Sequence, residues 1–408
     1  MAVTGDADLL AAALTPEFTD DPYPTYHALR AKGPISLTEI AWVTPSYECA
    51  AHVLRDPRMS SDEHHSNAYQ AMVAEQGGER PGGVIGDMPV MLFMDPPDHT
   101  RLRGLVNQAF TPSTVAKIRP RTEQVAGELL DAVADRGGTF DLVDDLAYPL
   151  PMTIICELLD VPDADRARFS EWSRALARAV DPSILLTPEI ERAIEEAGAE
   201  LLVYLGALFE ARRRAPGDDL LSSLIAASDE GDRLDEAELL AMTMLLLIAG
   251  HETTMNLIGN GMLALLRHPD QLALVRSGTV SMRSAVDELL RFDAPVQITQ
   301  RTARESIEVG GQTLARGEQV IVLLGAANRD PDVFAEPDRL DVARNDHRHL
   351  AFGGGIHHCL GAALARSEGE VAIRALVDRF EHIEIAGEPV RRTAFTLRGL
   401  TSLPLAAR

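Results

Sequence analysis

The sequence has few of the features that mark several common protein classes. Only three of its 408 residues are cysteines, Cys49, Cys156 and Cys359. This odd and sparse set excludes a disulfide framework, and its spacing does not fit a cysteine-rich zinc site. A lone cysteine usually fills an apolar core, and we expect this role for Cys49 and Cys156.

Basic residues are also scarce, with 38 Lys and Arg against 62 Asp and Glu and a formal net charge of −24. This balance argues against a general affinity for nucleic acid or anionic lipid. The apolar run at residues 9–14 follows no basic region and is too short for a signal-peptide core or a membrane span. We therefore expect a cytoplasmic protein without a membrane segment.

No linker, repeat or low-complexity stretch divides the sequence, so we predict a single domain over residues 1–408. Apolar residues recur at helical spacing, which predicts a mainly α fold. The helical stretches are 115–133, 191–213, 236–266, 282–291 and 361–380. Strand-like runs lie at 35–43, 306–309, 312–314 and 319–324, with a hairpin turn at Gly310 and Gly311. The segment 75–90 contains glycine and proline and is predicted to be a mobile loop.

The helix after Asp235 begins with a capping box, because Glu238 follows three residues later. Its apolar stretch 242–249 is interrupted by the polar residues that follow Ala249 and Gly250. Thr253 is placed to donate its hydroxyl to the carbonyl of Ala249, and Gly250 leaves room beside it. The segment is therefore either a small polar groove for dioxygen and water or a kink with satisfied polar groups.

Glu288 and Arg291 are spaced to share one helix face and form a bidentate ion pair. By itself this spacing is typical of a solvated surface pair. If the pair is buried it needs further partners to offset desolvation, and Arg339 is the candidate third member.

The most informative segment is the loop at residues 352–361, in which Gly353, Gly354 and Gly355 precede Cys359. Three glycines allow the backbone to fold tightly around a sulfur and to direct amide hydrogens at it, which stabilises a thiolate. Gly361 and the following alanines allow the next helix to approach a flat macrocycle. A phosphate loop would be expected to carry a lysine after its glycines, and zinc would need a fourth ligand besides His357, His358 and Cys359.

Together these segments resemble the cytochrome P450 family, in order from about residue 21 to the C-terminus. Residues 352–361 match its haem-binding signature, Glu288 and Arg291 its helical pair, and 249–253 its oxygen-activating segment. Residues 95–103 resemble the propionate-binding segment of the soluble bacterial members. His251 stands between the glycine and the acid as a common filler.

The resemblance implies a triangular helical prism with a small β-rich lobe, and haem b bound through Cys359 to iron. It also makes Glu288, Arg291 and Arg339 a structural core near the thiolate loop. Glu252 and Thr253 would deliver protons during oxygen activation. The remaining haem-binding residues that it implies are His99, Arg103, Ala249, Gly250, Arg301, Phe352, Gly353, His357 and Gly361.

The expected activity is hydroxylation or epoxidation of a hydrophobic small molecule with O2. A macrolide, terpenoid, steroid or other natural product would fit a pocket lined by residues 81–93, Leu246, Ala249, 295–298 and 395–397. The alternatives are a haem-thiolate sensor without turnover, a peroxide-driven enzyme, which would typically lack the acid and alcohol pair, and oxidative ring coupling.

Electrons are expected from a ferredoxin and a ferredoxin reductase, because the sequence contains no flavin or ferredoxin domain. The acid-free segment 99–121 predicts a docking surface for an acidic ferredoxin. Its other interpretation is a solvated helical face. The cations concerned are Arg101, Lys117, Arg119 and Arg121.

Overall fold

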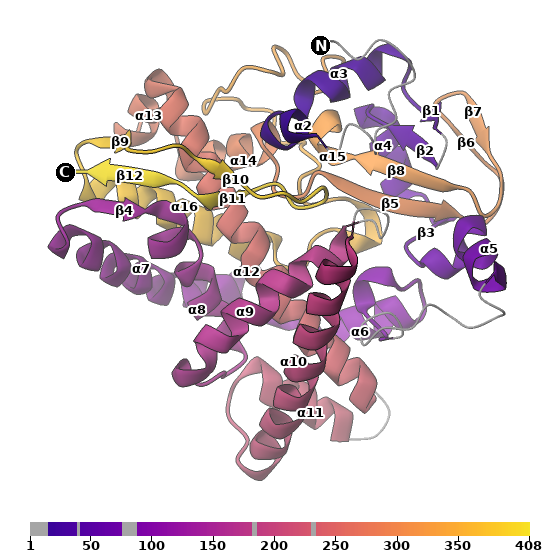
Figure 1. The fold of residues 1–408 in the computed structure, drawn as a ribbon, viewed down its shortest axis with the longest axis horizontal. Helices are drawn as coiled ribbons and strands as arrows, with labels where there is room; N and C mark the ends of the chain where they lie inside the picture. Colours follow the sequence, from indigo (N-terminus) through magenta and orange to yellow (C-terminus); the bar gives the residue numbers. More distant parts are fainter. Residues whose placement is uncertain (1–14, 39–40, 76–87, 182–185, 230–233) are drawn as a thin grey trace. The chain divides into compact units, whose positions relative to one another are not determined.

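The structure is a computed structural model that describes residues 15–38, 41–75, 88–181, 186–229 and 234–408. The chain divides into two units, each built from separate stretches of sequence, and Figure 1 labels their helices and strands. Unit 1 comprises residues 1–75, 260–359 and 389–401, and unit 2 comprises 76–259, 360–388 and 402–408. Helices dominate the described residues, which confirms the predicted mainly α class. The single domain stays a prediction.

Unit 1 contains a five-stranded sheet with the order β1-β2-β8-β5-β3. Strand β2 is parallel to β8, and the other neighbours in the sheet are antiparallel. The apolar strand β8 is buried along almost its whole length. The strands are β1 (Ser36–Leu37), β2 (Trp42–Thr44), β3 (Met59–Ser60), β5 (Ile298–Ala303) and β8 (Gln319–Leu323).

The predicted hairpin is present, with β6 (Ile307–Val309) paired to β7 (Gln312–Leu314). Gly310 and Gly311 have φ angles of 57° and 79°, as a tight two-residue turn requires. A Cβ on Gly310 would lie 2.8 Å from the Cys49 sulfur, so close packing also requires this glycine. Cys49 is buried in the core beside the sheet, which confirms its predicted role.

The helices of unit 1 include α4, which lies against β3, β6 and β8 (Figure 1). They are α2 (Pro16–Asp20), α3 (Tyr23–Ala31), α4 (Tyr47–Arg55), α5 (Asn67–Glu75), α13 (Pro269–Arg276), α14 (Met282–Phe292) and α15 (Leu324–Ala327). A short ribbon pairs β10 (Val390–Arg391) with β11 (Leu400–Ser402). The predicted loop at 75–90 lies largely outside the described residues.

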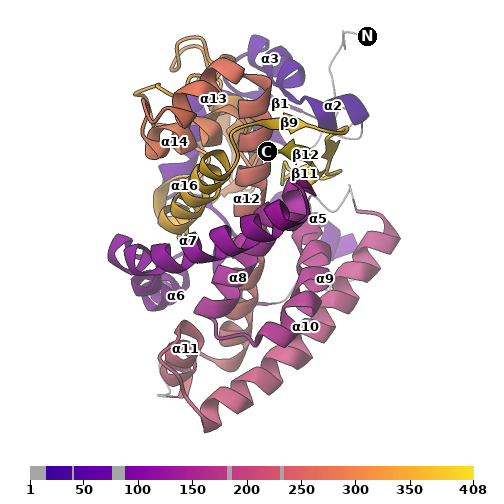
Figure 2. The ribbon, with the colours of Figure 1, turned by 90° about the vertical axis from the view of Figure 1, so that its left-hand side faces the viewer.

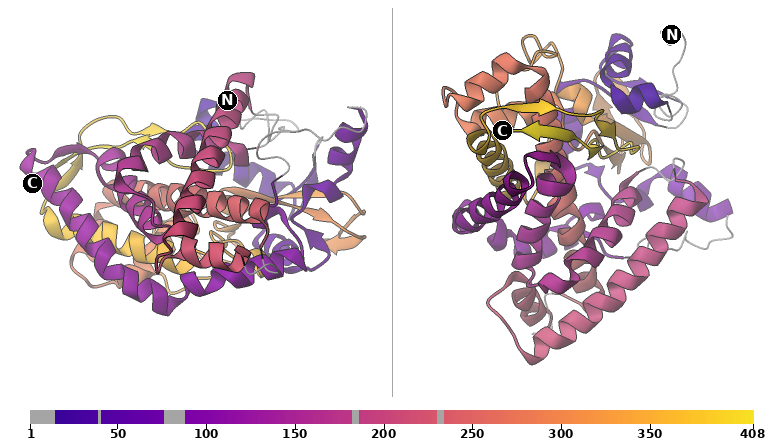
Figure 3. Two further views of the ribbon diagram at one scale, coloured as in Figure 1. Left: turned by 90° about the horizontal axis from the view of Figure 1, so that it is seen from below. Right: turned by 60° about the vertical axis from the view of Figure 1, so that its left-hand side comes forward.

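Unit 2 is built mainly of helices, and its α7 runs beside α16 (Figure 2). The long α10 packs along α9 (Figure 3), where Trp172 donates a hydrogen bond to Glu200 at 2.9 Å. A three-stranded sheet of order β4-β12-β9 completes the unit. Its helices and strands are α6 (Asp98–Val106), α7 (Pro112–Asp135), α8 (Pro149–Leu158), α9 (Arg166–Leu176), α10 (Pro188–Arg214), α11 (Leu220–Asp229), α16 (Ala362–Arg379), β4 (Thr139–Asp141), β9 (Ile383–Ile385) and β12 (Pro404–Ala407).

Helix α12 (Glu236–Arg267) begins at the predicted residue. The Asp235 amide donates to the Glu238 carboxylate at 3.0 Å, and the Glu238 amide donates to the Asp235 carboxylate at 2.7 Å. This reciprocal pair confirms the capping box. Over the part of the chain that the structure describes, no helix has the length and apolarity to cross a bilayer.

Candidate functional site

The loop around Cys359 lies in unit 1 and is closed by its own backbone. The Cys359 amide donates to the Phe352 carbonyl at 2.9 Å, and the Gly353 amide donates to Leu350 at 2.8 Å. Gly353 and Gly355 have φ angles of 67° and 66°, a conformation that glycine adopts without strain. The loop therefore presents Cys359 just before α16, as the glycine spacing predicts.

Two glycines of this segment differ in how closely the rest of the chain packs against them. A Cβ on Gly355 would lie 2.1 Å from the Leu54 carbonyl oxygen, so this glycine allows the loop to press against the end of α4. An added Cβ on Gly361 would meet no described atom within 4 Å. Contacts within the described chain thus require glycine at 355 but not at 361, and the approach of Gly361 to a bound group stays a prediction.

The three cysteines differ in exposure and chemistry. Cys359 is exposed, whereas Cys49 and Cys156 are buried. Burial raises the pKa of the Cys156 thiol to about 12 and also raises the pKa of Cys49. The thiolate is the form that ligates a metal, so Cys359 is the cysteine suited to that role.

The predicted propionate-binding cations fall in both units. In unit 2, His99 and Arg103 are one helical turn apart on α6, and His99 is buried. In unit 1, Arg301 lies on β5 and donates to the Gln300 carbonyl at 2.7 Å. His357 ends the short helix Gly355–His357 in the same loop as Phe352 and Gly353. Within unit 1, the exposed thiol of Cys359, the guanidinium of Arg301 and the glycine-lined loop have the donor chemistry that a haem requires.

In unit 2, helix α12 carries the predicted oxygen-activating segment. Thr253 donates its hydroxyl to the Ala249 carbonyl at 3.1 Å, as the sequence predicts. Ala249 is exposed and Thr253 partly so, whereas Glu252 is buried. The Thr253 side chain is therefore partly accessible to solvent, whereas the side chain of its neighbour Glu252 is buried.

Gly250 differs from its prediction. A Cβ there would lie 3.0 Å from the Ile155 side chain of α8, so packing of α8 uses the space that the sequence assigned to a groove. The helix is α-helical without interruption from Glu236 to Arg267. The expected opening is absent from this described helix, because Ile155 fills the volume beside the glycine.

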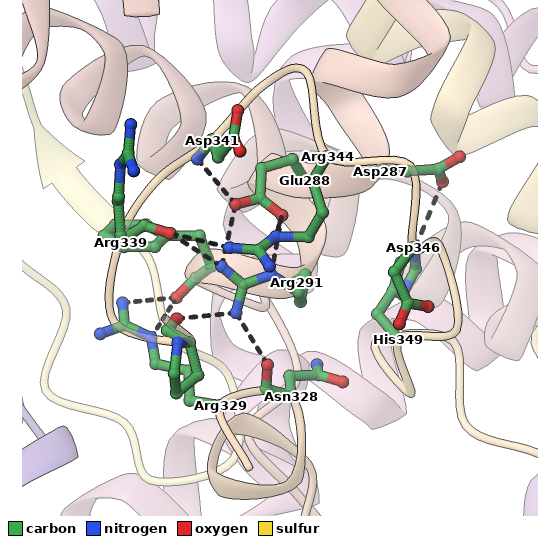
Figure 4. A network of polar contacts seen from close by, with 12 residues as sticks. Asp287, Glu288, Arg291, Asn328, Arg329, Arg339, Asp341, Arg344, Asp346 and His349 are labelled. Atoms are coloured by element: carbon green, nitrogen blue, oxygen red, sulfur yellow. Dashed lines mark hydrogen bonds and ion pairs between the residues drawn. The ribbon is translucent and has the colours of Figure 1, made fainter. Parts of the chain in front are cut away.

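The Glu288 and Arg291 pair is buried and bidentate (Figure 4), with N to O distances of 2.7 and 2.9 Å. The prediction that the Arg339 side chain is the third member of this pair was wrong. Arg344 donates to Glu288 at 3.1 Å, while the exposed guanidinium of Arg339 pairs with Glu336. Arg339 contributes only its carbonyl to Arg291, at 3.1 Å, because its side chain points toward solvent.

Two buried polar residues in unit 2 were missed by the sequence analysis. His251, predicted to be a filler, is fully buried and its Nε2 lies 3.0 Å from the Ser173 hydroxyl. Glu368 on α16 is 1% exposed. Burial raises its pKa to about 8, partly offset by the Thr254 hydroxyl. The sequence pattern could have identified Glu368 as a buried carboxylate, because it lies between Leu364 and Ala372 on the apolar face of the helix.

The acid-free segment 99–121 is neutralised by carboxylates from elsewhere in unit 2. Arg101 pairs with Asp98 and Glu238, Arg119 with Glu123 and Glu370, and Arg121 with Glu157. These three arginines are therefore paired with carboxylates that a reading of the segment alone does not reveal. Docking of a ferredoxin at this segment stays a prediction.

Comparisons with known proteins agree with these features. The sequence model of the family described as Cytochrome P450 matches residues 85–277 and 281–405. The chain is 45% identical to the vitamin D(3) 25-hydroxylase of Pseudonocardia autotrophica, over 95% of this chain and 94% of the relative. It is 42% identical to the 6-deoxyerythronolide B hydroxylase of Saccharopolyspora erythraea, over 95% and 96%. The crystal structure of ligand-free CYP164A2 from Mycobacterium smegmatis matches at a TM-score of 0.90 and 43% identity, over 98% of this chain and 99% of that one.

Proposed function

The chain belongs to the cytochrome P450 family and is a monooxygenase, and from this premise we propose that it binds haem b through Cys359 and oxidises an apolar natural product. The observation that carries the ligand assignment is the contrast among the cysteines. Cys359 is exposed in a closed glycine loop, whereas the other two are buried.

Bound haem supplies the oxidising chemistry, because a thiolate ligand donates electron density and favours O–O cleavage. His99, Arg103, Arg301 and His357 would bind the two propionates of the haem. Within unit 1, the placement of Arg301 on β5 and of His357 in the Cys359 loop supports this assignment. Phe352, Gly353, Gly361 and Ala249 would contact the bound haem, and Gly250 would do so only through its backbone, because Ile155 lies beside its Cα.

Thr253 and Glu252 move protons. The Thr253 hydroxyl, bonded to Ala249 on the accessible side of α12, donates a proton during oxygen activation. Glu252 is buried next to it in sequence and resupplies that proton. Thr253 is thus the proton donor on the accessible side of α12, and Glu252 is the carboxyl group, shielded from bulk water, that resupplies its proton.

The substrate is an uncharged, largely hydrophobic molecule. Two of the segments expected to line its pocket lie side by side within unit 1, because the Gln297 amide donates to the Thr396 carbonyl at 2.9 Å and Val296 pairs with Leu397. Phe93, from a third segment, is 47% exposed. Relatives of near-equal identity are named for hydroxylation of vitamin D(3) and of 6-deoxyerythronolide B. A sequence identity of 45% or 42% to these relatives therefore does not determine which substrate this protein oxidises.

The electron donors are a ferredoxin and a ferredoxin reductase that draws electrons from NAD(P)H, and the protein works in the cytoplasm. Docking at residues 99–121 cannot be tested by reversing Arg101 alone. A glutamate at 101 would face Glu238, which Arg101 now contacts at 3.0 Å. The exposed Lys117 is a better first target, and Lys117→Glu should slow reduction most at low ionic strength.

The test of this function is the spectrum of the reduced protein with carbon monoxide. Wild type should show the red-shifted Soret band of a thiolate-ligated haem, and Cys359→Ser should lose it. Cys156→Ser is the matched control, because its thiol is buried in unit 2 and should not affect the band. A band that survives in Cys359→Ser would overturn the ligand assignment. Product formation with NAD(P)H and O2 then separates a monooxygenase from a haem-thiolate sensor.

A further inference from the structure

Residues 348–352 lead into the Cys359 loop and are held by side chains from other parts of unit 1. The Leu350 amide donates to the side-chain oxygen of Asn328 at 2.6 Å. Next to it, the imidazole of His349 lies against Asp287 of α14 (Figure 4), with 3.2 Å between Nε2 and Oδ1. The His349 and Asp287 side chains are only 1% and 4% exposed. Two polar groups therefore meet at a buried place beside the segment that leads to the cysteine.

Hydrogen bonds define the orientation of the His349 ring. The Ala351 amide donates to Nδ1 at 3.3 Å, and a backbone amide can only donate. Nδ1 is therefore the acceptor of this bond, and Nε2 is the nitrogen that donates to Asp287. The Asp287 carboxylate also accepts a hydrogen bond at 2.9 Å from Arg283, whose side chain is 55% exposed. Each ring nitrogen thus has a partner, and a flipped ring would lose both bonds.

The His349 ring is connected to the cysteine through Phe352. The two rings are in contact, with 5.8 Å between their centroids and 47° between their planes. The Phe352 carbonyl accepts the hydrogen bond of the Cys359 amide at 2.9 Å, and the Gly353 amide donates to the Leu350 carbonyl at 2.8 Å. The residue that holds the Cys359 amide is therefore a residue that His349 contacts directly.

A buried histidine and aspartate need a reason at this place. Burial of a polar group is unfavourable unless the group is hydrogen-bonded, and apolar side chains of similar volume often give equal or greater stability than a buried ion pair. A hydrogen bond depends on direction as well as distance, whereas apolar packing does not. The pair therefore restricts the positions of Ala351 and Phe352 more narrowly than apolar contacts would.

We propose that Asp287 and His349 are positioning residues for Cys359, an inference that rests on the haem ligation proposed above. Asp287 orients the imidazole, and the imidazole holds the Ala351 amide and the Phe352 ring. Phe352 in turn holds the Cys359 amide, which keeps the sulfur at the place where it binds iron. Loss of the pair should therefore release the thiolate ligand while the rest of unit 1 is still folded.

The experiment compares loss of the ligand with loss of the fold. The reduced carbon monoxide form of the holoenzyme is kept in urea below the unfolding transition, and the thiolate band and far-ultraviolet circular dichroism are followed on the same samples. His349→Phe keeps an aromatic ring against Phe352 but removes both nitrogens. We expect its thiolate band to decay at least about ten-fold faster than that of wild type, because loss of a buried hydrogen bond to a charged group is enough for this factor. Its circular dichroism should not change over that time.

Two further variants separate positioning from general stability. Thr44→Val is the matched control, because Thr44 is fully buried in unit 1 and donates to the Pro34 carbonyl at 2.8 Å, outside residues 348–359. Its thiolate band should decay only as its circular dichroism is lost. Asp287→Asn keeps the side-chain volume and one acceptor oxygen, so its band should decay at a rate between those of wild type and His349→Phe. If His349→Phe does not fold, Asp287→Asn decides by the same comparison with Thr44→Val.

The two proposals fail in different ways. If wild type lacks the thiolate band, or Cys359→Ser keeps it, the proposed ligation fails and the positioning role fails with it. If wild type shows the band and Cys359→Ser loses it, the ligation stands. In that case, a band that decays in His349→Phe and Asp287→Asn only as their circular dichroism is lost, as in Thr44→Val, would overturn the positioning role alone.

Discussion

Replacement of Arg291 by methionine tests the buried network of unit 1 (Figure 4). The Arg291 side chain is 0% exposed and donates to both carboxylate oxygens of Glu288, at 2.7 and 2.9 Å. It also donates to the carbonyl oxygens of Asn328, Pro337 and Arg339, at 2.9, 2.8 and 3.1 Å. One side chain thus joins α14 to the chain that follows α15.

The expected loss of unfolding free energy in Arg291→Met follows from these contacts. Methionine occupies a similar path but donates no hydrogen bond. Loss of one partner of a buried ion pair destabilises by about 3–5 kcal/mol, and each buried carbonyl left without a donor adds roughly 1–3 kcal/mol. Arg344 remains 3.1 Å from Glu288 and compensates part of its charge. We therefore expect the free energy of unfolding to fall by at least about 5 kcal/mol, a large share of the ~5–15 kcal/mol typical of folded proteins.

The assay is urea unfolding followed by far-ultraviolet circular dichroism, with the thiolate band recorded on the same samples. Arg339→Met is the matched control, because its side chain is 59% exposed and pairs with an exposed Glu336. Its loss should lower the free energy of unfolding by less than about 1 kcal/mol. Equal losses in the two variants would refute the assignment of Arg291 to the core of the network and of Arg339 to its edge.

Three further predictions concern unit 2. Gly250→Ala places a methyl 3.0 Å from Ile155 and should lower the free energy of unfolding by about 1–3 kcal/mol. The double variant with Ile155→Val should recover part of this loss in the same urea assay, and no recovery would exclude the clash. Because burial raises the pKa of Glu368 to about 8, the folded state keeps a proton that the unfolded state loses above its lower pKa. Stability should therefore fall from about pH 5 to pH 8 by up to ~1.4 kcal/mol per unit, and an unchanged slope in Glu368→Gln would contradict this. Thr253→Ala should keep the thiolate band but release hydrogen peroxide at the expense of product, measured as peroxide per NAD(P)H, and unchanged coupling would count against its role.

Sequence patterns predicted those features that residues close together in the chain create by themselves. The capping box of Asp235 and Glu238, the Gly310 and Gly311 turn, and the Thr253 bond to Ala249 were all confirmed. Each depends on backbone geometry over a few residues, which residue type and spacing control directly. The exposed Cys359 after its glycines belongs to the same class.

Only the tertiary structure decided the partners that come from distant parts of the chain. It placed Ile155 against Gly250, Arg344 rather than the Arg339 side chain on Glu288, and Ser173 beside His251. It also placed carboxylates beside Arg101, Arg119 and Arg121, which lie in a segment of the sequence without acidic residues. A buried charge or hydrogen-bonding group must find a partner wherever packing brings one within reach, and that choice depends on how helices meet in space. The sequence by itself determined the glycine loop before Cys359 and the local helix and turn signals, because these depend on neighbouring residues. Tertiary packing determined the polar surroundings of Glu252, His251 and the Glu288 and Arg291 pair, because their partners come from distant parts of the chain.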